Sequence, residues 1–248
     1  AAPYTLVGGG NTVDYVPNPG YGGPDSFTFK ANDGGVPPDA GDSNIATISI
    51  TVGGPQAVHV FDMDTNPGWT TEGQWAWGQP TGGGSYNGDP TSGFTGTNVY
   101  GYNLNGDYVN SMPEYALTTY AIDCAEMTDV ELRFHRWLGV ESSTWDHARV
   151  DVSADGVNWD LIWDHAGVAI SDSSWTQYLY DISATADNEE TVYVRWTMGT
   201  TDTSVTYPGW NIDDVEIWGV VPVVYCPYDL DGNGTVGGGD INLVKFHY

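Results

Sequence analysis

The segment 209–219, with the sequence GWNIDDVEIWG, constrains the fold more than any other stretch of the chain. Its Trp, Ile and Val residues favour a β-strand, and two adjacent carboxylates, Asp213 and Asp214, interrupt the apolar run. Neighbouring residues of a strand point to opposite faces, so one carboxylate is expected to turn inward. A buried carboxylate needs a cation, an arginine or several N–H donors. Because the chain has only 6 Lys plus Arg, a metal ion is the expected partner.

The rest of the chain has the composition of an all-β protein. Its 33 Gly and 14 Pro, without a long pattern of period 3.6, predict many short strands joined by turns. Its 11 Trp and 16 Tyr supply a substantial core. The run ARVDVSADGVNWDLIWD predicts a hairpin that turns at Asp155-Gly156.

The charge of the chain excludes some partners. A formal net charge of −27 repels nucleic acid and anionic membrane surfaces, and it attracts divalent cations. Adaptation to high salt is an alternative explanation, but several carboxylates fall at ligand spacings, which favours calcium. No apolar stretch is long enough for a membrane span, so membrane insertion is not expected. The chain opens with AAPYTLVGGG rather than with a signal peptide, which favours a mature or internal piece of a longer protein.

Two acidic segments carry a resemblance. The I-D-D-V core at 212–215 and the upstream HVFDMD at 59–64 resemble the last and first strands of MAM-type and related secreted jelly-roll domains. The resemblance covers residues 57–220. It implies a jelly-roll β-sandwich whose first and last strands are neighbours, with a calcium-type site between them formed by Asp62, Asp64, Asp213 and Asp214. The turn at 105–108 adds Asp107 as a further candidate metal ligand.

The two cysteines, Cys124 and Cys226, fit either one disulfide or two thiols. The similar jelly-roll domains often pair the cysteine of an A-I-D-C strand with one just before G-W-N. Pro208 occupies that second position here, so the usual bridge of the family cannot form.

Residues 1–53 form a separate module. Their pattern P-N-P-G-Y-x-G-x-D-S-F resembles cadherin-like, immunoglobulin-like repeats of large bacterial surface proteins. Strands are expected at 26–30 and 45–52, yet only the second half of such a domain is present. Either the sequence begins at a cut, or a strand of another copy completes the sandwich and builds a head-to-tail filament.

The tail 226–248 contains the calcium-loop motif DLDGNGTVGGGD. Side chains fall at positions 1, 3, 5 and 12, and a backbone carbonyl at position 7. The predicted ligands are Asp229, Asp231, Asn233, Asp240 and the carbonyl of Thr235. The motif resembles a single dockerin repeat, which implies a short calcium loop-helix.

Aromatic and basic residues of the central part have two interpretations each. Trp69, Trp75 and Trp77 could line a sugar platform, but Trp75 and Trp77 share one strand face, which favours a role in covering the core. Four arginines lie on predicted strands. They are expected to pair with carboxylates, and a groove for an acidic ligand is the alternative; they are Arg133, Arg136, Arg149 and Arg195.

No catalytic motif accompanies these features. The chain has no H-E-x-x-H, G-x-S-x-G, P-loop or C-x-x-C pattern, so an enzyme is not expected. The sequence therefore predicts a non-catalytic, calcium-stabilised extracellular segment used for structure or adhesion, with other copies of itself or neighbouring surface modules as partners. The alternative is a carbohydrate-binding accessory module of an extracellular hydrolase, with polysaccharide as partner.

Overall fold

The computed structural model describes residues 21–29 and 45–221. The chain divides into two compact units, of which the larger is the central unit Gly53–Val221. The smaller unit combines Ala1–Val52 with Pro222–Tyr248. The calcium-loop motif of the tail and Cys226 lie outside the described residues, so the ligands predicted there stay predictions.

In the described part of the smaller unit, β1 (Gly23–Phe29) pairs antiparallel with β2 (Ala46–Val52). β2 matches the predicted strand at 45–52 to within one residue, whereas β1 begins three residues before the predicted strand at 26–30. Phe29 is 51% exposed and Ile45 71% exposed. A two-stranded sheet is marginally stable alone, but completion by another copy stays a prediction.

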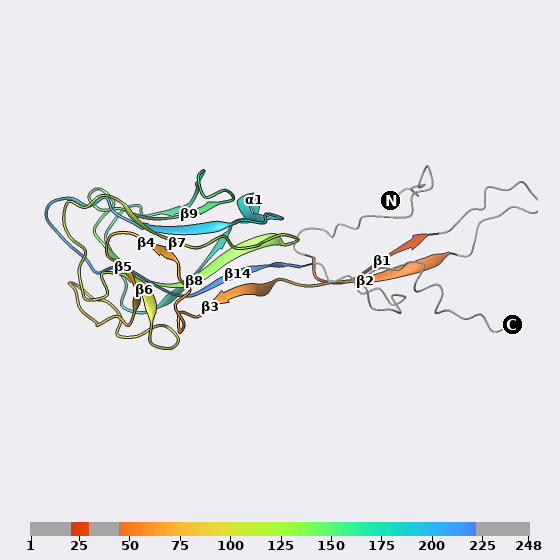
Figure 1. Ribbon diagram of the computed structural model, residues 1–248, viewed down its shortest axis with the longest axis horizontal. Helices are drawn as coiled ribbons and strands as arrows, with labels where there is room; N and C mark the ends of the chain where they lie inside the picture. The colour runs from red at the N-terminus through yellow and green to blue at the C-terminus, as the bar shows by residue number, and fades with distance from the viewer. Residues whose placement is uncertain (1–20, 30–44, 222–248) are drawn as a thin grey trace, which may run out of the picture. The chain divides into compact units, whose positions relative to one another are not determined.

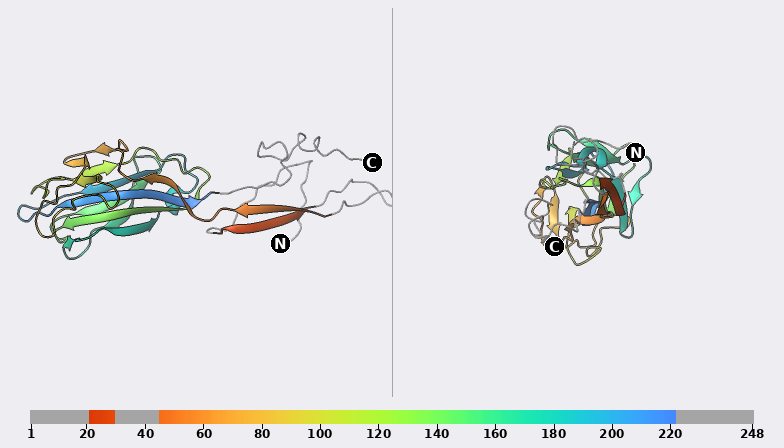
Figure 2. Two further views of the ribbon diagram at one scale, coloured as in Figure 1. Left: turned by 90° about the horizontal axis from the view of Figure 1, so that it is seen from below. Right: turned by 90° about the vertical axis from the view of Figure 1, so that its right-hand side faces the viewer.

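The central unit is a sandwich of two antiparallel sheets packed face to face (Figure 1), and Figure 2 shows the same layers from below. One sheet has seven strands: β3 (Gln56–Phe61), β5 (Trp75–Gly78), β6 (Val99–Tyr102), β8 (Thr128–Val140), β11 (Ile170–Ser171), β12 (Thr176–Asp181) and β14 (Gly209–Val220). The other has five: β4 (Thr70–Thr71), β7 (Tyr115–Thr118), β9 (Ala148–Ser153), β10 (Asp160–Asp164) and β13 (Tyr193–Met198). The one short helix described is α1 (Ser183–Ala186). The predicted all-β jelly-roll class is confirmed.

Strand β14 organises the larger sheet. It pairs with β8 along most of its length, with β6 at residues 211–212, and with β3 at residues 215–219. The prediction that the first and last strands of the central unit are neighbours is therefore confirmed. The hairpin of β9 and β10 also forms, and the Asp155 carboxylate accepts the backbone N–H groups of Val157 and Asn158 at its turn.

A bulge in β14 changes how its two carboxylates point. The register shifts after Asp213, and Asp214 has a φ of 45°. Ile212 and Val215 face the core, whereas Asp213 is fully buried on the outer face of the sheet. The expectation that one carboxylate turns inward is met by the burial of Asp213, although Asp213 lies beneath the 79–98 loop rather than in the core between the sheets. The bulge breaks the alternation, and both carboxylates reach Thr95.

The core between the sheets is strongly aromatic. Trp69 stacks on Tyr100 with ring centroids 5.2 Å apart and on Trp196 at 5.7 Å. Trp69 and Trp75 are almost completely buried, so neither can form a sugar platform. Trp77 is partly buried and donates its Nε1–H to the carbonyl of Met63 at 2.8 Å. Trp75 and Trp77 therefore cover the core, and burial rules out the platform interpretation for Trp69 and Trp75, whereas a sugar contact of Trp77 stays a prediction.

The 79–98 loop, which joins β5 to β6, covers the outer face of the seven-stranded sheet. The ring of Phe94 stacks on His135 with centroids 3.6 Å apart. The Nε1–H of Trp137 donates to the carbonyl of Gly88 at 2.8 Å. These contacts place a layer of loop over polar residues of β8 and β14, which explains how polar side chains are buried outside the core.

Beneath this loop, Asp89 is only 4% exposed. Its Oδ1 accepts Nδ2–H of Asn211 at 2.7 Å, whereas Asp89 Oδ2 and Asn211 Oδ1 have no hydrogen-bond partner in the described part of the chain. Burial raises the pKa of Asp89 to about 7, with a smaller upward contribution from Asp107. The donated hydrogen bond from Asn211 opposes this shift.

Replacing Asp89 by Asn should stabilise the protein in a pH-dependent way. Between about pH 4, where unfolded Asp ionises, and about pH 7, the folded carboxyl keeps its proton and the unfolded one does not. Stability is therefore lost as the pH rises through this window. The Asn variant has no such titration, and its amide can donate to Asn211. The free energy of unfolding of Asp89→Asn should therefore exceed that of wild type by an amount that grows as the pH rises to about 7. This difference should reach at most about 4 kcal/mol and stay constant at higher pH.

Urea unfolding from pH 4 to pH 8 measures this difference. Glu190→Gln, which removes one exposed carboxylate, is the control and should show no comparable trend. A difference between Asp89→Asn and wild type that does not vary with pH would contradict the assignment.

Candidate functional site

The 79–98 loop brings three oxygens together beside Gly93. A Cβ on Gly93 would lie 2.2 Å from the Thr95 carbonyl oxygen, 2.5 Å from Asp213 Oδ2 and 3.0 Å from the Asn98 carbonyl oxygen. We call this arrangement the Gly93 cradle. Calcium takes oxygen ligands at about 2.3–2.6 Å from carboxylates and backbone carbonyls. These values show that the backbone of Gly93 packs closely against one carboxylate and two carbonyl oxygens, which are oxygen donors of the kind that calcium takes.

The other predicted ligands lie around the same loop. Asp64 packs against Gly96, where an added Cβ would overlap its carboxylate. Asp62 Oδ1 accepts the backbone N–H of Asp64 at 3.1 Å, and Asp62 is close enough to Asp214 to raise the pKa of that carboxyl. Thr95 Oγ1 donates to Asp214 at 2.7 Å. Asp62, Asp64, Asp213 and Asp214 thus lie around residues 93–96, but no three of their carboxylates have oxygens within 4.8 Å of one another, so a shared calcium site between them stays a prediction.

The electrostatics of this region show an excess of negative charge. Burial raises the pKa of Asp213 to about 7, and burial also raises that of Asp214. The nearest basic group is His135, whose Nδ1 lies 3.9 Å from Asp214 Oδ2 and whose pKa is lowered by burial. No Lys or Arg of the described residues forms a salt bridge with either carboxylate. A bound cation would supply the missing positive charge.

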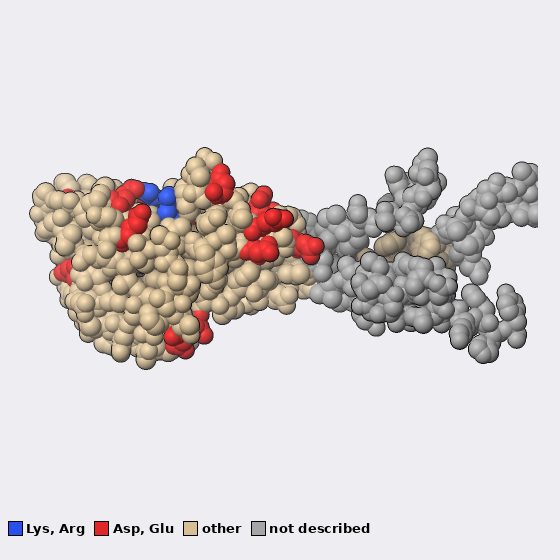
Figure 3. Space-filling view, in the orientation of Figure 1, with Lys and Arg blue, Asp and Glu red and all other residues tan. Residues whose placement is uncertain are grey.

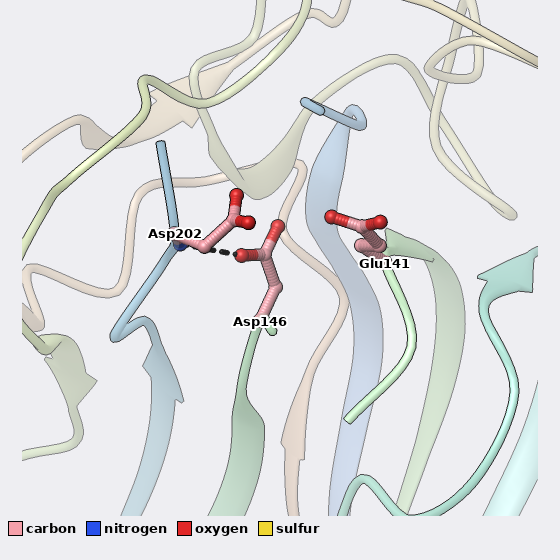
Figure 4. Close-up of side chains that lie close together, drawn as sticks. All are labelled: Glu141, Asp146 and Asp202. Atoms are coloured by element: carbon pink, nitrogen blue, oxygen red, sulfur yellow. Dashed lines mark hydrogen bonds between the residues drawn. The ribbon is translucent and has the colours of Figure 1, made fainter. Parts of the chain in front are cut away.

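A second acidic group, the loop-end trio, consists of Glu141, Asp146 and Asp202. Figure 4 shows their carboxylates pointing toward one another from three loops, and one oxygen of each lies within 4.8 Å of the others. Asp146 is fully buried, accepting the Asp202 N–H at 2.9 Å and the hydroxyl of Tyr108. Burial, Asp146 and Asp202 raise the pKa of Glu141, whose Oε2 has no hydrogen-bond partner in the described part of the chain. The loop-end trio could hold a metal ion.

Asp107 makes several contacts with protein donors. Its Oδ1 accepts the backbone N–H of Ser85 at 2.7 Å, and its Oδ2 accepts the hydroxyls of Ser85 at 2.5 Å and Thr206 at 3.2 Å. These bonds tie the 79–98 loop to two other loops. The role of Asp107 as a metal ligand stays a prediction.

Arginines and carboxylates alternate on the outer face of the five-stranded sheet. Arg149 donates to both oxygens of Glu114, at 2.5 and 2.8 Å, and through Nε to Asp151 at 3.1 Å. Arg195 donates through Nη2 to the same Asp151 oxygen at 3.0 Å. On the other sheet, Arg136 pairs with Asp172 at 3.1 Å. The predicted pairing of strand arginines with carboxylates is confirmed.

A pocket of about 390 Å³ opens beside this network. It is lined by Glu114, His147, Arg149, Leu161, Asp164 and Thr200. Figure 3 shows basic atoms next to acidic ones at the upper edge of the central unit. The pocket and the loop-end trio share two segments, since His147 follows Asp146 and Thr200 precedes Asp202, and the His147 N–H donates to the Thr200 carbonyl at 3.1 Å.

Sequence reasoning missed both the pocket and the loop-end trio. Their residues come from loops and strands far apart in the chain, and none belongs to a recognisable motif. The Thr95 and Asn98 carbonyls were missed for another reason: any residue has a backbone carbonyl, so its use as a ligand leaves no trace in the sequence.

The described residues contain no helix of the length and apolarity that a membrane crossing requires. Cys124 is fully buried.

No protein-family model matches the chain, so the MAM-type, cadherin-like and dockerin-like resemblances stay predictions. Over 172 residues the chain is 33% identical to bacillopeptidase F of Bacillus subtilis (strain 168), a match that covers 67% of this chain and only 11% of that protein. Among solved structures, the K1 cleaved adhesin domain of Lys-gingipain from Porphyromonas gingivalis W83 is similar with a TM-score of 0.41 and 16% identity, covering 66% of this chain and 98% of that one. The CBM22-1 xylan-binding domain of Paenibacillus barcinonensis Xyn10C is similar with a TM-score of 0.41 and 12% identity, covering 68% and 97%. The family 11 carbohydrate-binding module of Clostridium thermocellum gives 0.39 and 14%, covering 67% and 96%.

Proposed function

We propose that the central unit is a carbohydrate-binding accessory module of an extracellular protein, and that its ligand occupies the pocket on the five-stranded sheet. The observation that carries this proposal is the composition of the pocket. Its carboxylates can accept hydrogen bonds from sugar hydroxyls, and His147 and Thr200 add further polar groups. Leu161, 59% exposed, offers an apolar contact for the C–H face of a sugar ring.

The same pocket argues for binding without hydrolysis. A glycosidase needs one carboxylic acid that stays protonated, with a raised pKa, and a second carboxylate. Hydrogen bonds from Arg149 lower the pKa of Glu114 instead. Glu114 is thereby held ionised, which suits it for accepting hydrogen bonds and makes it a poor general acid.

A second candidate function is structural: a calcium-stabilised segment of a surface protein that serves adhesion or assembly. The Gly93 cradle favours it. We propose that calcium binds there through Asp213 and the Thr95 and Asn98 carbonyls, with Asp62, Asp64 and Asp214 close by. Calcium would supply positive charge and fix the 79–98 loop to the sheet. The two functions are compatible, because the cradle and the pocket belong to different sheets.

Calcium should raise the melting temperature of the chain by several degrees, because a ligand at 100 times its Kd adds about 2.7 kcal/mol. Gly93→Ala places a methyl group among the three oxygens, and Asp213→Asn removes a ligand charge. Each variant should show a smaller calcium-dependent increase than wild type, measured against its own sample in excess EGTA.

Gly54→Ala is the matched control, because nothing lies within 4 Å of an added Cβ at that position. Measuring the increase within each variant separates calcium binding from any strain that the substitution causes. Retention of the full increase in both Gly93→Ala and Asp213→Asn would sink the assignment of calcium to the cradle.

The pocket should bind soluble polysaccharides, such as xylan or mixed-linkage β-glucan, in affinity gel electrophoresis. Leu161→Asp should weaken that binding about tenfold through loss of apolar contact. Leu179→Asp is the control, since Leu179 is 50% exposed on β12 of the other sheet. Equal losses in the two variants would contradict the pocket as the site. Release of reducing sugar that disappears in Glu114→Gln would overturn the non-catalytic proposal.

A further inference from the structure

The guanidinium groups beside the pocket are already engaged by the protein. Arg149 uses its Nε, Nη1 and Nη2 donors on Asp151 and Glu114. Arg195 uses Nε and Nη2 on Asp151. An acidic sugar would have to displace these bonds, and the displaced carboxylate of Asp151, which is only 4% exposed, would be left buried without a partner. The pocket is therefore poorly suited to an acidic glycan.

Carboxylates outnumber guanidinium groups at this site. Asp164 lies opposite Arg149 in the pairing of β10 with β9, and it lines the pocket. In the described part of the chain Asp164 forms no salt bridge, because Arg149 is taken by Glu114 and Asp151. Asp164 is exposed, so its carboxylate can meet a ligand at little cost in desolvation. The lining combines the carboxylates of Glu114 and Asp164 with Arg149 and His147, and Asp164 is the exposed carboxylate left to pair with a positively charged ligand.

We propose that the pocket binds an amino-sugar glycan with protonated amines and that Asp164 pairs with an amine and determines this specificity. This inference rests on the proposed carbohydrate-binding function and names its ligand class. Sugar hydroxyls and ammonium groups are both donors, which matches the acceptors that Glu114 and Asp164 present. An N-acetylated sugar offers the same ring without the charge, so it lacks the ion pair.

The test compares two hexasaccharides that differ only in acetylation: the β-1,4-linked glucosamine hexamer and the N-acetylglucosamine hexamer. Calorimetric titration at low salt and mildly acidic pH, where the amines are protonated, should show the glucosamine hexamer binding about tenfold more tightly, since several exposed ion pairs of modest strength add. Asp164→Asn should lower this preference about threefold. Added NaCl should reduce it further.

Glu190→Gln is the matched control, because it removes the same charge from an exposed residue outside the pocket. Equal losses in Asp164→Asn and Glu190→Gln would show general attraction only and overturn the role of Asp164. Equal or tighter binding of the acetylated hexamer, or tighter binding of polygalacturonate, would overturn the ligand class while leaving carbohydrate binding intact. A lysine hexamer that binds as tightly as the glucosamine hexamer would overturn sugar recognition. If neither hexamer binds and neutral polysaccharides also fail, the proposed function falls as well.

Discussion

Buried carboxylates in a chain with very few basic residues are the constraint on which the rest of this structure depends. Three of them are satisfied in different ways, whereas Asp89 keeps one oxygen without a hydrogen-bond partner in the described part of the chain. Asp213 accepts the backbone N–H groups of Thr95 and Asp214, Asp151 is shared by two arginines, and Asp146 accepts a tyrosine hydroxyl and the Asp202 N–H. The few arginines of the central unit lie on strands, where they pair with carboxylates. In the loops, carboxylate and carbonyl oxygens lie close together without an arginine.

Much of the fold could be predicted because strand periodicity and turn chemistry are local signals. The hairpin at Asp155 and the strand at 209–220 follow from residues adjacent in sequence. The burial of Asp213 outside the core could not be predicted. It depends on a bulge in β14 and on a contact with a loop more than a hundred positions upstream. Neither feature leaves a recognisable pattern in the sequence of β14.

The same distinction between local sequence signals and long-range contacts applies to the candidate sites. Asp62, Asp64, Asp213 and Asp214 were found because they flank neighbouring strands, and a resemblance pointed to them. Their partners in the 79–98 loop are glycines and backbone carbonyls, which any flexible loop contains. The loop-end trio is assembled from three loops whose separate sequences carry no common pattern. Trp69 was misjudged because an aromatic residue looks the same in sequence whether it stacks on a sugar or on Tyr100.

The aromatic core determines whether binding at one face of the sandwich can affect binding at the other. The Gly93 cradle lies on the outer face of one sheet and the pocket on the outer face of the other, with Trp69, Trp196 and their stacked neighbours between them. Such a close-packed layer has one arrangement rather than two, and coupling between distant sites needs an element with alternative states. Binding free energies at the two faces should therefore add, so that the affinity proposed for the pocket would not depend on whether a cation occupies the Gly93 cradle.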